Sequence, residues 1–339
     1  MRKSLVSRIP TALLLLAVVL LLSSCGWSLW DSPMTTVRPK SEFGRITHGI
    51  FMLISWWTLG IGILVEGALL WACFHYREKP GLPLPKQVHG HTLLEVSWTV
   101  VFALILLIFA IPTIPVIFKT QEAPAATALR VDVSGRQWWW EFKYPDLKVV
   151  TANELHLPAG QEVSFNLHAP DVIHSFWMPQ LGGKRDVVPA RVNRITLTPD
   201  GPGEFPGQCA EYCGMSHANM RFRIIVHDKA GFEQWVAAQL KPAVQPTDPL
   251  AQKGQELFAQ LTCVGCHTIA GVSGGVLGPN LTHFGSRKTL GANLLANTPE
   301  NVAKWIENPG HLKPGALMPD LGLRGEQPKA LAAYLLSLK

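Results

Sequence analysis

Two long apolar stretches near the start of the chain limit its possible folds more than any other feature. They cover residues 46–74 and 93–118. As helices they would be about 43 Å and about 39 Å long, which is enough for two tilted membrane crossings. The short segment between them carries Arg77, Lys79 and Lys86. Because cytoplasmic loops are enriched in Lys and Arg, this segment is expected in the cytoplasm. The mature N-terminus and everything after Phe118 are then expected on the outer side of the membrane.

Residues 1–24 have the order of a lipoprotein export signal. A positive start with Arg2 and Lys3 precedes an apolar run at residues 11–22, and two serines precede Cys25. This order predicts cleavage before Cys25 and acylation of its thiol, which would attach the mature N-terminus to membrane lipid. The alternative is an uncleaved anchor helix with an incidental cysteine.

Composition and periodicity divide the rest of the chain. Hydrophobic residues make up 47% and charged residues 16%, which favours a membrane protein, and the net charge of +6 lacks the dense basic run that nucleic-acid binding needs. An N-terminal segment and the apolar hairpin cover residues 25–118. Period-two alternation then predicts a β-sandwich over residues 128–238. A Pro-rich linker at residues 239–250 leads to a small α domain at residues 251–339, so a multidomain membrane protein is predicted.

A group of potential metal ligands lies near the end of the predicted sandwich. Cys209, Cys213, His217 and Met220 are close in sequence, and His174 lies upstream of them. Two thiolates, two imidazoles and a thioether suit copper, and two cysteines can bridge a pair of copper ions. A disulfide or a closed Cys2His2 zinc site is the alternative, but both leave the methionine without a role.

This ligand pattern resembles the copper A site of the cytochrome c oxidase subunit II family, whose extracytoplasmic sandwich has a cupredoxin fold. The resemblance implies that the five side chains bind a binuclear copper centre. It also implies that Glu211 supplies its main-chain carbonyl, and that the Glu211 side chain reaches a Mg²⁺ shared with subunit I. Simple solvation of that carboxylate is the alternative.

Two further residues acquire roles from the same resemblance. Trp138, in the aromatic segment at residues 137–140, would lie where electrons enter the copper domain. Glu95, at the start of the second apolar stretch, would stand at the mouth of a proton pathway into subunit I. The simpler alternatives are an aromatic strand face for the first and a favourable helix N-terminal charge for the second.

The C-terminal domain contains the motif Cys263-Val-Gly-Cys266-His267. A Cys-x-x-Cys-His motif attaches c-type haem covalently through its two thiols, and its histidine binds the iron. A redox disulfide or half of a zinc site could also use the cysteines. The Met-Pro step at Met318 resembles the distal ligand of class I cytochromes c, and His283 and His311 compete for that position.

Together the two sites predict the electron-accepting subunit of a haem-copper terminal oxidase. Its haem c would take electrons from an upstream donor, either cytochrome c or a cytochrome bc-type complex. Copper A would pass them to subunit I for reduction of O2 to water, coupled to proton pumping. A bacterial inner membrane location is expected, with other oxidase subunits as partners. A plain electron-transfer lipoprotein is one alternative, but a carrier anchored by lipid needs no pair of membrane spans. A nitrous oxide reductase is the other, but it would need a separate His-rich cluster domain, and the histidines of this chain are scattered.

Overall fold

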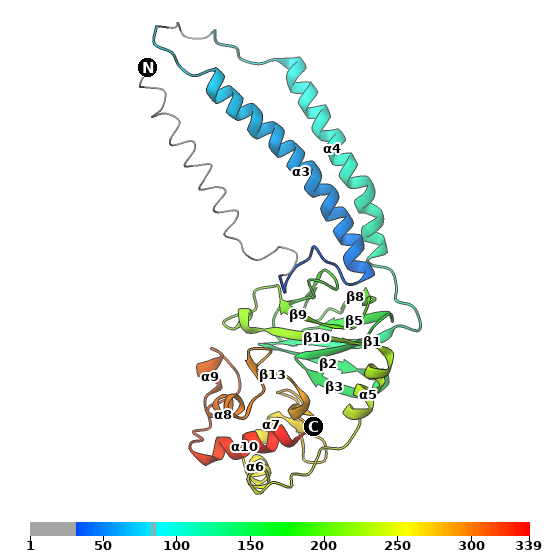
Figure 1. Cartoon of the computed structure of the whole chain (residues 1–339), viewed down its shortest axis with the longest axis vertical. Coiled ribbons are helices and arrows are strands. Elements are labelled where there is room, and N and C mark those ends of the chain that lie inside the picture. Colours follow the sequence, from blue (N-terminus) through cyan, green and yellow to red (C-terminus); the bar gives the residue numbers. More distant parts are fainter. Residues whose placement is uncertain (1–31, 82, 84–85) are drawn as a thin grey trace, which may run out of the picture.

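The computed structural model describes residues 32–81, 83 and 86–339. The predicted export signal and Cys25 lie outside these residues. From the described N-terminal end, the chain forms a helical hairpin, a β-sandwich and a helical C-terminal domain in succession (Figure 1). The predicted fold class is confirmed.

The hairpin consists of α3 (Glu42–His75) and α4 (Thr92–Lys119). Both helices are long and apolar enough to cross a membrane, and each contains its predicted stretch with a few extra residues at either end. They pack against each other, for example through an edge-on contact between Trp57 and Phe109 at 6.3 Å. The N-terminal end of α3 and the C-terminal end of α4 lie next to the β-sandwich, and the hairpin extends away from it (Figure 1).

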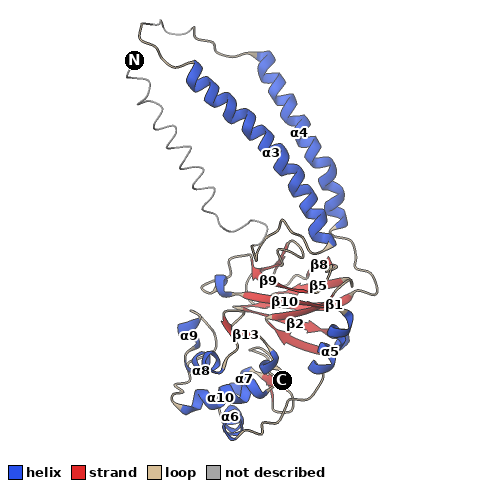
Figure 2. Ribbon diagram, in the orientation of Figure 1, coloured by secondary structure: helices blue, strands red, loops and turns tan. Residues whose placement is uncertain are grey.

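The β-sandwich is built from two five-stranded sheets. One has the order β3-β2-β1-β5-β8 and the other β4-β10-β9-β6-β7. Their strands are drawn in red in Figure 2. The β1–β5 and β10–β4 pairs are parallel, and the other pairs are antiparallel. The strands are β1 (Leu129–Arg136), β2 (Trp139–Tyr144), β3 (Val149–Ala152), β4 (Glu154–Pro158), β5 (Val163–His168), β6 (His174–Trp177), β7 (Lys184–Val187), β8 (Asn193–Leu197), β9 (Gly203–Cys209) and β10 (Arg221–His227).

Aromatic side chains fill the space between the sheets. Phe176 and Phe222 stack with ring centroids 4.8 Å apart, and Trp140 and Phe142 meet them edge-on. All four side chains are fully buried. Because offset and edge-on aromatic pairs stabilise beyond their buried area, this cluster gives the strands that carry the site a rigid base.

One helix closes the sandwich. It is α5 (Lys229–Gln239), which begins at the capping residue Asp228. Its Trp235 stacks on His156 of β4 with ring centroids 4.3 Å apart. The chain then passes through the Pro-rich linker to the C-terminal domain.

The C-terminal domain is mainly helical, with α6 (Pro249–Gln260), α7 (Cys263–Cys266), α8 (Pro299–Glu307), α9 (Pro309–Leu312) and α10 (Glu326–Ser337). It also contains two short antiparallel pairs, β11 (Thr268–Ile269) with β12 (Ser273–Gly274) and β13 (Thr289–Leu290) with β14 (Leu295–Ala296). These two-residue strands carry no periodic signal, so the sequence predicted helices alone. The domain lies on the side of the sandwich away from the hairpin (Figure 1).

The domain core depends on close packing of α6 against α10. Gly254 of α6 faces the main chain of Ala330 in α10, and a methyl group on Gly254 would overlap the Ala330 carbonyl oxygen. Phe258 and Tyr334 meet edge-on beside this crossing. Glycine is therefore needed at position 254 for the two helices to approach.

We predict that Gly254→Ala separates the two helices and lowers the local free energy of unfolding by about 1–3 kcal/mol, as overpacking does. Amide hydrogen exchange in α6 and α10 of the full chain measures this loss. Gly310→Ala is the matched control, because the nearest neighbour of its added methyl is 3.8 Å away. Equal exchange in the two variants would contradict the prediction.

Candidate metal centres

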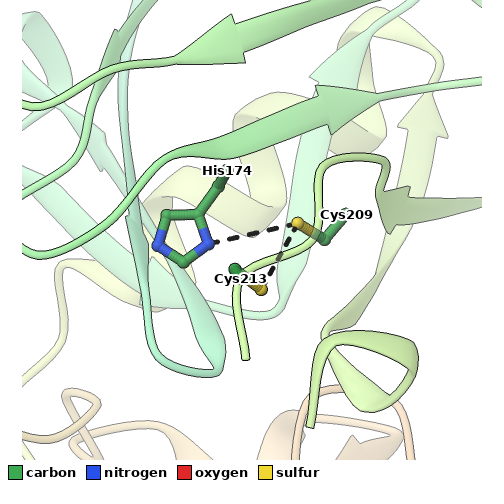
Figure 3. Close-up of side chains that lie close together, drawn as sticks. All are labelled: His174, Cys209 and Cys213. Atoms are coloured by element: carbon green, nitrogen blue, oxygen red, sulfur yellow. Dashed lines mark hydrogen bonds between the residues drawn. The ribbon is translucent and has the colours of Figure 1, made fainter. Parts of the chain in front are cut away.

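Three of the predicted ligands meet at one end of the sandwich. His174 begins β6, Cys209 ends β9, and Cys213 lies in the loop that follows (Figure 3). All three are buried, and their ligand atoms lie within 4.8 Å of one another. The two sulfur atoms are 3.8 Å apart, whereas a disulfide requires about 2.05 Å. The cysteines are therefore free thiols here, available to a metal.

The remaining predicted donors surround Cys213 and Cys209. Nδ1 of His217 lies 3.6 Å from the Cys213 sulfur, and the Met220 sulfur lies 3.8 Å from it. The carbonyl oxygen of Glu211 lies 3.3 Å from the Cys209 sulfur. The structure thus brings together two thiols, two imidazoles, a thioether and a carbonyl. This donor set fits copper, because soft sulfur and imidazole ligands favour it.

The two thiols share their protons unequally. The hydrogen bond to Cys213 lowers the pKa of Cys209, helped by the hydrogen bond to His174. The same hydrogen bond to Cys209, together with burial, raises the pKa of Cys213. The metal-free site is therefore expected to hold one thiolate and one thiol.

Asp171 orients the upstream histidine and was missed by the sequence analysis. Its Oδ1 accepts a hydrogen bond from Nε2 of His174 at 2.9 Å, which leaves Nδ1 facing the Cys209 sulfur at 4.0 Å. Main-chain N–H groups of Gln137 and Val172 also donate to Asp171. Burial alone would raise the pKa of Asp171, but the hydrogen bonds from His174, Gln137 and Val172 outweigh it and lower this pKa. Its position three residues before the histidine was the available sequence signal, since a carboxylate often fixes a ligating imidazole.

Trp138 contacts the same loop from the aromatic segment. Its indole N–H donates to the carbonyl oxygen of Cys213 at 3.0 Å, and Gln137 Nε2 donates to that oxygen at 2.7 Å. The Trp138 side chain is buried, with 8% of its surface exposed. A predicted electron-path residue is thus in direct contact with the ligand loop.

The second site is a cavity of about 540 Å³ in the C-terminal domain. Cys263, Cys266 and His267 line it from α7 and the residue that follows. Met318 lines it from the loop before α10. The wall also includes Trp138 of the sandwich, so the cavity lies at the boundary between the two domains.

His267 is held in the tautomer that metal binding requires. Its Nδ1 donates to the carbonyl oxygen of Pro279 at 2.8 Å, so the other ring nitrogen carries no proton in the neutral form. Burial lowers the pKa of His267, which favours that neutral form. Gly278 lies so close to the ring that a side chain there would collide with it. The histidine is therefore positioned and oriented before any ligand binds.

A half-buried cation adds to the wall of this cavity. Arg287 lines it, and partial burial lowers the pKa of its guanidinium group to about 10. Two thiols, an oriented imidazole, a thioether and a half-buried cation around a mainly apolar cavity fit a haem with anionic propionate groups. No periodicity or motif in the sequence pointed to Arg287.

Met318 is the predicted axial candidate that lines the cavity. His283 is buried elsewhere in the domain, where its Nε2 donates to the carbonyl oxygen of Gln239 at 3.0 Å. His311 is exposed in α9. Neither histidine is among the residues that line the cavity, so the geometry favours the methionine.

The two predicted carboxylates have exposed positions. Glu95 lies in the first turn of α4, where its Oε1 accepts a hydrogen bond from the main-chain N–H of His91 at 3.2 Å. This contact caps the helix, and a role in proton uptake stays a prediction. The Glu211 side chain is exposed beside the thiol cluster, and Mg²⁺ binding there also stays a prediction.

Comparisons with known proteins match the chain along most of its length. The transmembrane domain model of cytochrome c oxidase subunit II matches residues 39–116, and its periplasmic domain model matches residues 147–228. The cytochrome c model matches residues 251–339.

Three curated relatives match nearly the whole chain. Cytochrome c oxidase subunit 2 of Alkalihalophilus pseudofirmus is 37% identical over 329 residues, covering 95% of each chain. The proteins of the same name from Bacillus sp. PS3 and Bacillus subtilis are 34% and 33% identical. The match to the Bacillus sp. PS3 protein covers 95% of each chain. The match to the Bacillus subtilis protein covers 96% of this chain and 97% of the relative.

A membrane hairpin, a thiolate-containing sandwich and a cytochrome c domain define a membrane-bound redox subunit. The chain belongs to the cytochrome c oxidase subunit 2 family. It is therefore a subunit of a terminal oxidase, a membrane protein with an extracellular domain. Family membership implies a copper A centre and a haem, and both sites contain donors that fit these groups.

We predict that Asp171→Asn weakens copper binding by about tenfold to a hundredfold, because a partner that orients a ligating histidine contributes that much to affinity. Competition titration with a copper chelator measures the effect. Asp186→Asn on β7 is the matched control, because Asp186 is exposed and outside the cluster. Unchanged affinity in the Asp171 variant would show that the hydrogen bond to His174 does not hold the ring.

We predict that copper affinity rises with pH. The raised pKa of Cys213 means that the metal must displace a proton from this thiol, and each released proton tightens binding by up to about tenfold per pH unit. The lowered pKa of Cys209 means that its proton is already lost and adds no dependence. Copper titrations from about pH 6 to about pH 8 give the slope of copper affinity against pH. A copper affinity that does not change with pH would contradict a metal-free site with one thiolate and one thiol.

Proposed function

We propose that this chain accepts electrons at a covalently bound haem c and passes them through copper A to subunit I of the oxidase. The observation that carries this proposal is the position of Trp138. Its ring lines the cavity of the C-terminal domain, and its N–H group donates to the carbonyl of Cys213 in the thiol loop. One side chain therefore touches both sites.

The cavity residues divide into attachment and axial roles. Cys263 and Cys266 would hold a haem through thioether bonds, and His267 and Met318 would be the side chains that bind its iron. Bound haem supplies one-electron chemistry at this position. The chain's own contribution is to orient the imidazole through Pro279, to exclude water with the apolar wall and to keep the thioether in reach.

The thiol cluster would hold two copper ions in a fixed frame. Cys209 and Cys213 would bridge them, His174 and His217 would each bind one, and the Met220 sulfur and the Glu211 carbonyl would complete the ligand set. A binuclear copper centre supplies a low-reorganisation electron carrier. Because β6, β9 and the loop are anchored on the aromatic core, we expect the donors to move little when the centre changes its redox state.

The hairpin and the exposed carboxylates suggest how the chain joins its partners. The lipid-facing helices would pack on subunit I and the other subunits of a bacterial inner-membrane oxidase, where O2 is reduced to water with proton pumping. Glu95 would serve a proton pathway from the cytoplasmic side. Glu211 would take part in a Mg²⁺ site at the subunit I interface. Acylation of Cys25 would add a lipid anchor, and a cytochrome c or a cytochrome bc-type complex would donate electrons.

The optical and low-temperature paramagnetic resonance spectra of the loaded full chain test this function. We expect a mixed-valence seven-line copper signal beside a low-spin c-type haem. A haem spectrum alone, with both sandwich cysteines titrating as free thiols in the presence of copper, would contradict the copper assignment. A haem that is removed by acidified organic solvent would contradict covalent attachment.

We predict that Met318→Leu lowers the haem midpoint potential and changes its spin state, because a thioether axial ligand raises the potential and completes the low-spin iron. Redox titration and the optical spectrum measure both effects. His311→Gln is the matched control, since His311 is exposed and outside the cavity wall. A shift in the histidine variant and none in the methionine variant would reverse the axial assignment.

A further inference from the structure

Lys313 has an unusual environment that the proposed function leaves unexplained. It follows α9 and lies five residues before Met318, and only 4% of its surface is exposed. Lysine is almost never buried to this degree unless its amine is paired. Among the described residues Lys313 forms no salt bridge, so main-chain groups must compensate its amine.

The Lys313 amine joins the two extracytoplasmic domains. Nζ donates to the carbonyl oxygen of Trp138 in the sandwich at 2.6 Å and to the carbonyl oxygen of Gly291 in the C-terminal domain at 2.9 Å. Burial lowers the pKa of this amine to about 7. Both charged and neutral forms of an amine can donate two hydrogen bonds. The side chain therefore bridges the two domains through two donated hydrogen bonds, whether the amine is charged or neutral.

The two residues after Lys313 also fit against the sandwich. The carbonyl oxygen of Pro314 accepts a hydrogen bond from the Ser216 hydroxyl at 2.6 Å, in the loop that carries the copper ligands. Gly315 lies against the Trp138 ring, where a Cβ atom would be 2.8 Å from the ring edge. Three consecutive residues of the loop that leads to Met318 thus contact the copper domain.

A second contact between the domains lies away from this loop. Oε1 of the buried Glu154 in β4 accepts hydrogen bonds from the main-chain N–H groups of Lys288 and Thr289, at 2.8 Å and 3.1 Å. Lys288 also pairs with Glu204 of β9. Two contact regions at separate places restrict rotation of the C-terminal domain against the sandwich more than either contact would alone.

We propose that Lys313 is a positioning residue that fixes the loop carrying Met318 onto Trp138, so that haem and copper exchange electrons at one constant separation. This inference rests on the proposed electron-transfer function. A flexible linker alone would give a high effective concentration and transfer by repeated collision. The buried amine instead favours a permanently docked domain.

The consequence of losing the amine can be estimated. Lys313→Met keeps most of the side-chain volume but leaves the Trp138 and Gly291 carbonyls without this donor. Hydrogen bonds from an amine of this kind are strong enough that the docked population should fall by about tenfold to a hundredfold relative to the undocked one. Electron transfer would then be limited by domain motion.

The test measures haem-to-copper electron transfer in the full chain, loaded with both cofactors, after rapid photochemical reduction of the haem. In Lys313→Met we expect the rate to fall and to become dependent on solvent viscosity, with the spectra and midpoint potentials of both sites unchanged. Lys304→Met, at an exposed position of α8, is the matched control and should keep the wild-type rate. A wild-type rate without viscosity dependence in Lys313→Met would overturn the proposal.

A measurement on the unmodified chain covers the case in which Lys313→Met fails to fold. Pulsed paramagnetic resonance of oxidised haem and mixed-valence copper gives the distribution of distances between them. One narrow distribution is expected, and a broad distribution would overturn the permanently docked domain. Failure of the proposed function would look different, because the unmodified chain would then lack the copper signal or show no transfer at all.

Discussion

The carbonyl oxygen of Cys213 is the point on which both sites depend. It accepts hydrogen bonds from the Trp138 indole and from the Gln137 amide, and so ties the thiol loop to the aromatic segment after β1. The Gln137 main chain in turn donates to Asp171, which orients His174. This short chain of contacts holds ligands from separate strands in one frame, and its tryptophan also forms part of the haem cavity wall.

The sequence predicted the parts of the molecule whose chemistry is local. The two apolar stretches, the alternating strands and the Cys-x-x-Cys-His motif each lie within a short window, and the structure has helices, strands and a lined cavity at these places. The distant His174 was predicted as a ligand from its residue type and from the family resemblance, and it lies beside Cys209 and Cys213.

The residues that were missed act through contacts between distant segments. Arg287 and Lys313 belong to no motif, and their roles depend on surroundings that only the fold brings near. Asp171 stands three residues before the histidine that it orients, but it also accepts a hydrogen bond from the distant main chain of Gln137. The short β11–β12 and β13–β14 pairs are too brief for any periodicity to appear. The docking of the C-terminal domain on the sandwich could not be predicted either. A Pro-rich linker predicts that the two domains are close but does not predict their relative orientation.

The arrangement explains why one chain can carry two redox groups without a diffusing partner between them. The membrane hairpin fixes the sandwich at the surface, the sandwich fixes the thiol cluster, and the boundary contacts place the haem cavity against Trp138. Each step uses a rigid element to position the next one. In the proposed function, electron flow from haem to copper would require no large movement of any described part of the chain.

The concentration dependence of haem-to-copper electron transfer shows whether the electron moves within one chain. In the loaded full chain, the haem is reduced by a light pulse and the arrival of the electron at copper is followed optically. We expect a single rate that is the same at every protein concentration, because both groups belong to one chain. A rate that rises in proportion to protein concentration, or an electron that stays on the haem, would contradict it.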